Sequence, residues 1–173
     1  DRNVDRISED RLAEIRELSN SERVDRIDSS KFTDADWERF DAELHSETLE
    51  FCRTNSNSEE LHAFANTWIW DAGTDALQIL LDNPACEAAT ALLIYWKAAP
   101  EYYRQYANRS AVEAAYANVD DFDFLNNLER RYVAGAFPIM RLSFDPNSHE
   151  DCGGTKYVGT YGDREEAFVR ELP

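Results

Sequence analysis

The sequence predicts an all-α protein: a single-domain bundle of about six or seven helices around a buried central helix, followed by a short irregular or extended C-terminal segment. Three observations indicate this class. Apolar residues recur at intervals of three and four, the spacing of one face of an α-helix. The chain of 173 residues has only six glycines and five prolines, too few for a loop-rich β fold. One segment, "AATALLIYW", is apolar on nearly every side, which is typical of a helix enclosed by others.

The first 32 residues are predicted to form a charged N-terminal helical segment or docking arm. In "SEDRLAEIRELS", Ser8 is expected to cap a helix. Leu12, Ile15 and Leu18 then follow at intervals of three along one stripe of that helix.

Residues 33–53 predict a stronger helix. Thr33 is expected to cap it, and acidic residues fill its first turn, as the helix dipole favours. The stripe that we expect to be buried consists of Trp37, Phe40, Leu44 and Phe51.

Four acidic residues of this helix fall on one flank of the apolar stripe. At about 100° per residue they lie within about 60° of one another, and they are Asp36, Glu43, Glu47 and Glu50. Like charges one turn apart on a helix each destabilise it by a few tenths of a kcal/mol. This acidic flank is therefore either a solvated face or a surface for a partner.

Ser58 is expected to cap the next helix, with Leu61, Phe64, Ala65 and Trp68 on its inner face. His62 lies off that face and is expected at the surface or rim, as is His45 on the preceding helix. The stretch "TWIWDAG", residues 67–73, is predicted to be a helix junction in which Trp70 remains available to a partner.

Asp71 or Thr74 is expected to cap a short helix after this junction. Asn83-Pro84 is then expected to open the central helix, because proline is favoured at a first helical position. This helix runs through Trp96, and Ala99-Pro100 ends it.

The tyrosine-rich residues 100–120 predict a helix pair or a broken helix. Asp120 or Asp121 is expected to cap the last helix, and Gly135 to follow its end. Residues 33–146 are thus predicted as the helical core domain, and residues 147–173 as a C-terminal loop and tail.

The net charge of −17 is the strongest compositional signal. Such a chain repels nucleic acid and anionic membranes and attracts a basic protein, although acidity also serves solubility alone. No apolar run approaches the roughly 20 residues that span a bilayer. Three widely spaced cysteines fit reduced thiols better than a disulfide framework, so we expect a cytoplasmic protein.

No motif in the sequence predicts a metal, a cofactor or a catalytic centre. The run from His149 to Cys152 offers too few convergent ligands for a metal, and "GGTK" has the wrong order for a phosphate loop. The aspartates at 120, 121 and 123 lack the glycine and the distal glutamate of a calcium loop. A catalytic Cys52 or Cys86 would need a histidine nearby in space, and the apolar surroundings of Cys86 favour a buried, inert thiol. Trp68, Trp70 and Asp71 are the residues that could contribute to a carbohydrate-cleaving site.

Four segments resemble, in order, the uncharacterised bacterial family called domain of unknown function 4274. They are "LHAFANTWIWDAG", "NPACEAATALLIYW", "FLNNLERRYVAGAF" and "LSFDP", and the resemblance covers about residues 58–146. The most specific pieces are "TALLIYW" and W-D-x-G. Ile69 and Ala72 depart from the asparagine and the second acid usual in that family.

The resemblance implies a cytoplasmic binding protein rather than an enzyme, because some members of the family look like immunity proteins of polymorphic toxin systems. It assigns no catalytic residue. We therefore expect an immunity protein that occludes a basic toxin, with Asp36, Glu43, Glu47, Glu50 and Trp70 in the interface. The alternatives are an adaptor or scaffold module that docks through residues 1–32 and, less favoured, a small hydrolase.

Overall fold

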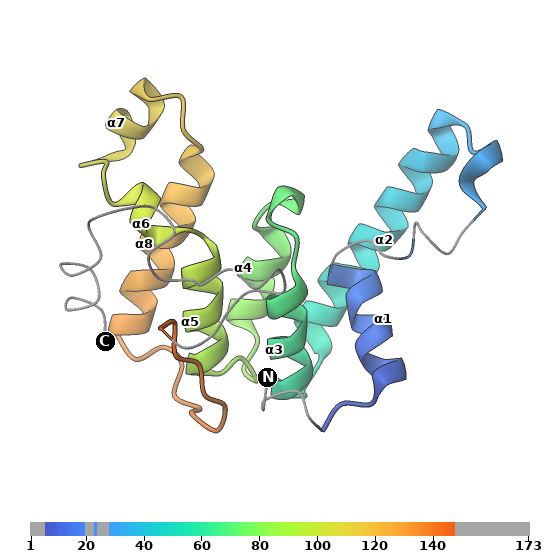
Figure 1. Cartoon of the computed structure of the whole chain (residues 1–173), viewed down its shortest axis with the longest axis horizontal. Coiled ribbons are helices and arrows are strands. Elements are labelled where there is room, and N and C mark those ends of the chain that lie inside the picture. Colours follow the sequence, from blue (N-terminus) through green and yellow to red (C-terminus); the bar gives the residue numbers. More distant parts are fainter. Residues whose placement is uncertain (1–5, 20–22, 24–27, 148–173) are drawn as a thin grey trace. The chain divides into compact units, whose positions relative to one another are not determined.

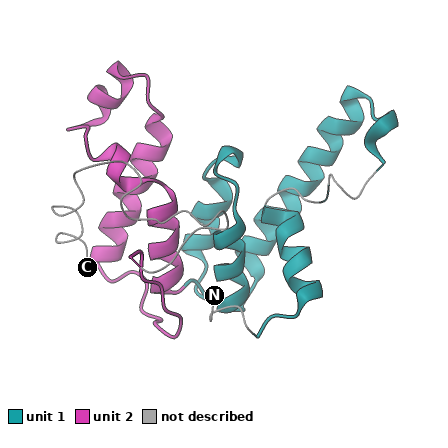
Figure 2. Cartoon of the chain, in the orientation of Figure 1, with its two compact units in different colours: residues 1–86 teal, residues 87–173 magenta. Residues whose placement is uncertain are grey.

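The computed structural model describes residues 6–19, 23 and 28–147, and the regular secondary structure of that part consists of helices, without a strand (Figure 1). The chain is divided into two compact units, which are residues 1–86 and residues 87–173 (Figure 2). The all-α prediction is confirmed. The described residues contain α1 (Glu9–Ser19), α2 (Asp34–Thr54), α3 (Ser58–Thr67), α4 (Asp75–Asp82), α5 (Ala88–Lys97), α6 (Pro100–Tyr103), α7 (Arg109–Ala114) and α8 (Val119–Val133), together with the 3-10 helices η2 (Ser29–Lys31) and η3 (Trp70–Ala72).

In the first unit α1 packs on α3 and α2, and α2 packs on α4. Ile15 of α1 is fully buried, and Arg11 binds Glu60 of α3 at 2.6 Å. At the other end of α1, the hydroxyl of Ser19 lies 2.6 Å from that of Thr67. The predicted helix of the N-terminal segment is therefore present, and its apolar stripe is used within the first unit.

Asn83 ends α4 and ties together three segments of the first unit. Its amide nitrogen donates to the carbonyls of Cys52 and Asn55, both at 2.9 Å, and its carbonyl oxygen accepts from the backbone N–H of Ala85 at 2.8 Å. These bonds hold the chain in a turn, so the prediction that Asn83-Pro84 opens the next helix is wrong. The central helix α5 begins instead at Ala88.

The helix junction predicted for "TWIWDAG" is confirmed. Trp68 ends α3 in a buried position, and its ring nitrogen donates to the carbonyl of Gly73 at 3.1 Å. Gly73 has a φ of 83°, a conformation that glycine adopts without strain. Thr74 then precedes α4 as its N-cap residue.

His62 corrects one expectation, because it is completely buried rather than at the surface. Its neighbours Leu61, Ala63 and Phe64 are buried as well. Since α1 packs on α3, this helix has more than one covered face. His45 is exposed, as expected.

In the second unit α5 packs on α8 and on the short α6, and α7 packs on α8. Eight of the ten residues of α5 are buried, in agreement with the predicted central helix. The tyrosine-rich segment forms a helix pair, α6 and α7. Asn118, and not an aspartate, caps α8: its side chain accepts from the backbone N–H groups of Asp120 and Asp121. Gly135, with a φ of 74°, follows the end of α8 as predicted.

The carboxylate of Glu87, directly before α5, holds the irregular segment after α8. It is completely buried and accepts the backbone N–H groups of Arg141 at 2.7 Å and Leu142 at 2.8 Å. The Arg141 side chain donates to the same carboxylate at 3.0 Å. The segment after Gly135 thus has an irregular path that one buried acid fixes.

Candidate functional site

The acidic flank of α2 lies on the surface, but most of its charges have partners within the chain. Glu47 pairs with Arg23 at 2.7 Å, and Glu50 pairs with Arg53 at 2.9 Å. These ion pairs offset the like-charge repulsion that made the flank a candidate for a partner.

Asp36, a third member of the flank, belongs to the start of α2. Its carboxylate accepts the backbone N–H of Thr33 at 3.0 Å and the Thr33 hydroxyl at 2.7 Å, and these bonds lower the pKa of Asp36. Asp36 also pairs with Arg39 at 2.7 Å. Thr33 and Asp36 thus form a capping box, a local structural role.

Glu43 is the member of the flank that remains exposed without an ion pair among the residues that the structure describes. Trp70 is half-buried in η3 at the helix junction, and its neighbour Ile69 is exposed. The predicted interface residues therefore do not form one uniform surface.

The outer half of α2, residues 34–43, carries a different feature. The prediction that Trp37, Phe40 and Phe51 are buried is wrong, since all three are half-buried. Trp37 and Phe40 contact Phe32 and each other edge to face. Burial on α2 begins only at Leu44. Figure 1 shows the outer half, together with η2, extending away from α1, α3 and α4. We call Phe32, Trp37 and Phe40 the aromatic patch.

Exposed carboxylates flank the aromatic patch on both sides. They are Asp34, Glu38, Asp41 and Glu43, which we call the acidic rim. Within the described ranges none of the four makes an ion pair. Residues 31–43 also contain Lys31, Arg39 and Asp36, of which the last two pair with each other. The patch and its rim thus combine apolar ring surface with a net negative charge.

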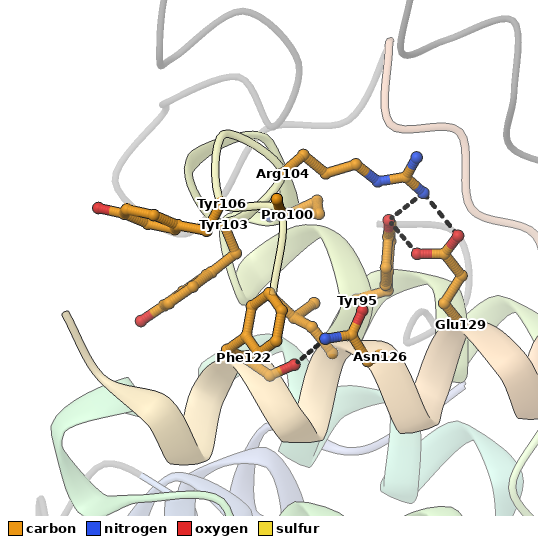
Figure 3. A pocket seen from close by; sticks show the side chains of 10 residues that line it. Tyr95, Pro100, Tyr103, Arg104, Tyr106, Phe122, Asn126 and Glu129 are labelled. Carbon is orange, nitrogen blue, oxygen red and sulfur yellow. Dashed lines mark hydrogen bonds and ion pairs between the residues drawn. The ribbon is translucent and has the colours of Figure 1, made fainter. Parts of the chain in front are cut away.

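The second unit contains a pocket of about 270 Å³ between α5, α6 and α8 (Figure 3). Tyr103, Tyr106 and Phe122 contribute aromatic rings to its lining. At one end the guanidinium of Arg104 binds Glu129 at 2.6 Å and the Tyr95 hydroxyl at 3.4 Å. The Tyr95 hydroxyl in turn donates to Glu129 at 3.3 Å.

Burial raises the pKa of the pocket's two inner tyrosines. Desolvation is the main cause that raises the pKa of Tyr95 and of Tyr103, and nearby carboxylates act in the same direction. The Tyr103 hydroxyl donates to the buried Asp121 at 3.2 Å. The sequence is rich in tyrosine here, but the pairing of Arg104 with Glu129 depends on contact between segments that are distant in the sequence.

The remaining chemical candidates are not supported by their surroundings. Burial raises the pKa of Cys52 to about 12, so its thiol is not an activated nucleophile. Of the three aspartates at the start of α8, Asp121 binds Tyr103 and Asp123 pairs with Arg109. No cluster of three metal-ligating side chains occurs in the described part of the chain. His149 to Cys152 and the "GGTK" segment lie outside it.

No helix in the described part of the chain has the length and apolar character needed to cross a membrane. This finding agrees with the absence of a long apolar run in the sequence.

Comparison with protein families gives one match: residues 56–133 match the model of the family described as Domain of unknown function (DUF4274). The resemblance read from the sequence segments is therefore confirmed for this region. The match begins after α2 and includes all the residues that line the pocket. Neither the curated proteins nor the solved structures gave a match.

Proposed function

We propose that this chain is a non-catalytic binding protein that neutralises a basic bacterial toxin by occluding it, and that it docks through the outer half of α2. The observation that carries the proposal is the aromatic patch, which lies half-exposed next to the exposed carboxylates of the acidic rim.

The patch has the composition of an interface centre. A few residues supply most of the binding energy at protein interfaces, and Trp is enriched among them where it becomes fully covered. The edge-to-face contacts of Phe32 with Trp37, at 5.1 Å between ring centroids, hold the two rings in place before binding. Little side-chain freedom would then be lost on docking.

The acidic rim supplies the complementary property. Exposed carboxylates around an apolar centre attract a basic surface, increase the association rate and exclude acidic partners. Of the four acids expected in the interface, Glu43 is retained in the proposed surface, because Asp36, Glu47 and Glu50 form ion pairs within the chain. Trp70 lies at the helix junction and is left to a secondary role.

The adaptor alternative assigned the docking role to residues 1–32. Ile15 and Ser19 of that segment are buried in the first unit, where α1 packs on α3. This arrangement favours α2 over α1 as the exposed element.

The first test is co-expression in bacteria with the product of the gene adjacent to this protein's own gene. If that product is a toxin, growth stops when it is expressed alone and recovers when this chain is present. A neighbour that is harmless, or that remains lethal in the presence of the chain, contradicts the proposal.

The second test maps the interface. Trp37→Ser and the double variant Asp41→Lys/Glu43→Lys should each abolish rescue and weaken the purified complex at least about tenfold, a loss of about 1.4 kcal/mol that one anchor residue can account for. The charge variant should also flatten the salt dependence of association.

Matched controls come from the second unit. Tyr116→Ser removes an aromatic ring that is 98% exposed, and Glu113→Lys reverses an exposed acid on α7. Both should rescue growth as well as the unaltered chain does. If the α2 variants also rescue growth fully, the interface is elsewhere.

A further inference from the structure

The pocket of the second unit has a composition that the proposed function does not use. Its aromatic side is formed by Tyr103, Tyr106 and Phe122, and its charged end by Arg104 and Glu129 (Figure 3). A volume of about 270 Å³ is just below the range of about 300–1,000 Å³ that is usual for small-molecule sites. It suits a group of the size of one amino-acid side chain.

The aromatic residues in the lining of this pocket favour positive charge. An aromatic ring carries negative charge density on its face and attracts a cation within about 6 Å. The hydroxyl of Tyr103 donates to the carboxylate of Asp121, and that of Tyr95 donates to Glu129. Donation to a carboxylate adds to the electron density of each ring.

The charges around the pocket point in the same direction. Arg104 is the cation in the lining, and its charge is matched by Glu129 at 2.6 Å. Beside the aromatic side, the carboxylate of Asp121 accepts a hydrogen bond from the Tyr103 hydroxyl, so the carboxylates of Glu129 and Asp121 lie at the pocket against the guanidinium of Arg104. An anion would meet an excess of negative charge, and a cation would reduce it.

We propose that the pocket binds a side-chain-sized organic cation, a guanidinium or alkylammonium group, on the ring faces of Tyr103, Tyr106 and Phe122, with Glu129 as its counter-charge. A carboxylate accepts several hydrogen bonds, so Glu129 retains capacity beside Arg104. The cation is either a free small molecule or an arginine or lysine side chain of a protein. The site lies in the second unit and is independent of the proposed docking through α2.

The test is a titration of the full chain with n-propylguanidinium, followed by nuclear magnetic resonance, with the neutral and similarly shaped n-propylurea as control. Saturable binding is expected, with shift changes centred on Tyr103, Tyr106 and Phe122. Propylurea should bind at least about tenfold more weakly, since a desolvated cation–ring contact accounts for that factor. Equal binding of both probes, no saturation, or shift changes elsewhere would overturn the proposal.

A variant pair tests the rings themselves. Phe122→Leu keeps an apolar side chain and should weaken propylguanidinium binding about three- to tenfold. Tyr116→Leu, which removes an exposed ring outside the pocket, should have no effect. If circular dichroism shows that Phe122→Leu disturbs the fold, Tyr106→Leu takes its place. Wild-type affinity in a folded pocket variant would contradict the site.

Binding of a capped Gly-Arg-Gly peptide, with a capped Gly-Ala-Gly peptide as control, distinguishes the two possible sources of the cation. Affinity of the arginine peptide equal to that of propylguanidinium supports a protein side chain as the ligand. Binding of the free cation alone supports a small molecule. The titrations do not depend on whether the α2 variants rescue growth. One proposal can therefore be contradicted while the other stands.

Discussion

At the scale of single residues, Glu87 is a completely buried acid in the second unit. Its carboxylate is fully buried and accepts two backbone N–H groups and the Arg141 side chain at 2.7–3.0 Å. Hydrogen bonds to a buried charged group contribute more than neutral ones, and the loss of a partner leaves donors unsatisfied. One side chain thus joins the start of α5 to the segment that follows α8.

We expect Glu87→Gln to lower the free energy of unfolding by about 2–4 kcal/mol, because the amide offers one acceptor oxygen where the carboxylate offers two. Urea unfolding followed by circular dichroism measures the change. Glu113→Gln, at an exposed ion pair on α7, is the matched control and should leave the unfolding midpoint almost unchanged. Similar midpoints for the two variants would refute this role for Glu87.

The roles of Glu87 and Asn83 could not be predicted from the sequence. A glutamate before a helix and an asparagine before a proline are both common at helix ends. Their partners are 28–55 residues away in the sequence, at Asn55 for one and at Arg141 and Leu142 for the other. Local patterns contain no information about such contacts.

At the scale of helices, an ion pair holds α1 on α3. Arg11 binds Glu60 at 2.6 Å, and Asn55 donates to the same carboxylate at 2.8 Å. The bond from Arg11 is the main cause that lowers the pKa of Glu60 below its ordinary value of 4.5. The Arg11 guanidinium also lies over the Phe51 ring, 5.7 Å from its centroid.

A pH dependence follows from this lowered pKa. A carboxyl group whose pKa is lower in the folded state stabilises that state above its ordinary value, and the contribution is lost as the pH falls through the folded value. Relative to wild type, Glu60→Gln should therefore be less stable by about 1 kcal/mol or less at neutral pH. The difference should disappear as the pH falls below 4.5 towards the lowered pKa.

Urea unfolding midpoints at a series of pH values test this dependence, with the exposed Glu38→Gln as the reference variant. A difference between Glu60→Gln and wild type that stays constant across the series would mean that charge does not hold α1 in place.

Helical periodicity predicted the helices of this chain well, but it did not predict which of their faces are covered. The stripe of Trp37, Phe40, Leu44 and Phe51 was expected to be buried throughout, but of these four only Leu44 is buried and the other three are half-buried. His62 shows the opposite error, because α3 is covered on more than one side. Amphipathicity identifies an apolar face, whereas the packing of distant helices decides whether that face meets a neighbour.

At the scale of the whole molecule, the chain divides at residues 86 and 87, inside the predicted core domain of residues 33–146. The family match, residues 56–133, includes parts of both units and begins after α2. The candidate docking surface on α2 thus lies outside the matched region, whereas the pocket lies within it. A protein family can retain a scaffold while a separate element contacts the partner, and this division of roles fits the proposed function.

The net charge of −17 acts on the molecule as a whole. Excess charge of one sign destabilises a compact state through self-repulsion. From about 0.01 M to about 1 M salt the screening length falls from about 30 Å to about 3 Å. We therefore expect the melting temperature to rise with sodium chloride, because exposed ion pairs lose little when they are screened.

Neutral substitutions distinguish this repulsion from other effects of salt. The double variant Asp41→Asn/Glu43→Gln removes two exposed charges of the acidic rim and should raise the melting temperature by a few degrees at low salt, but not at high salt, where repulsion is already screened. Glu129→Gln, which removes a partner of Arg104, should lower the melting temperature at both low and high salt. Calorimetric scans of the three proteins at both salt concentrations measure these shifts, and a rim variant no more stable than wild type at low salt would contradict the expectation.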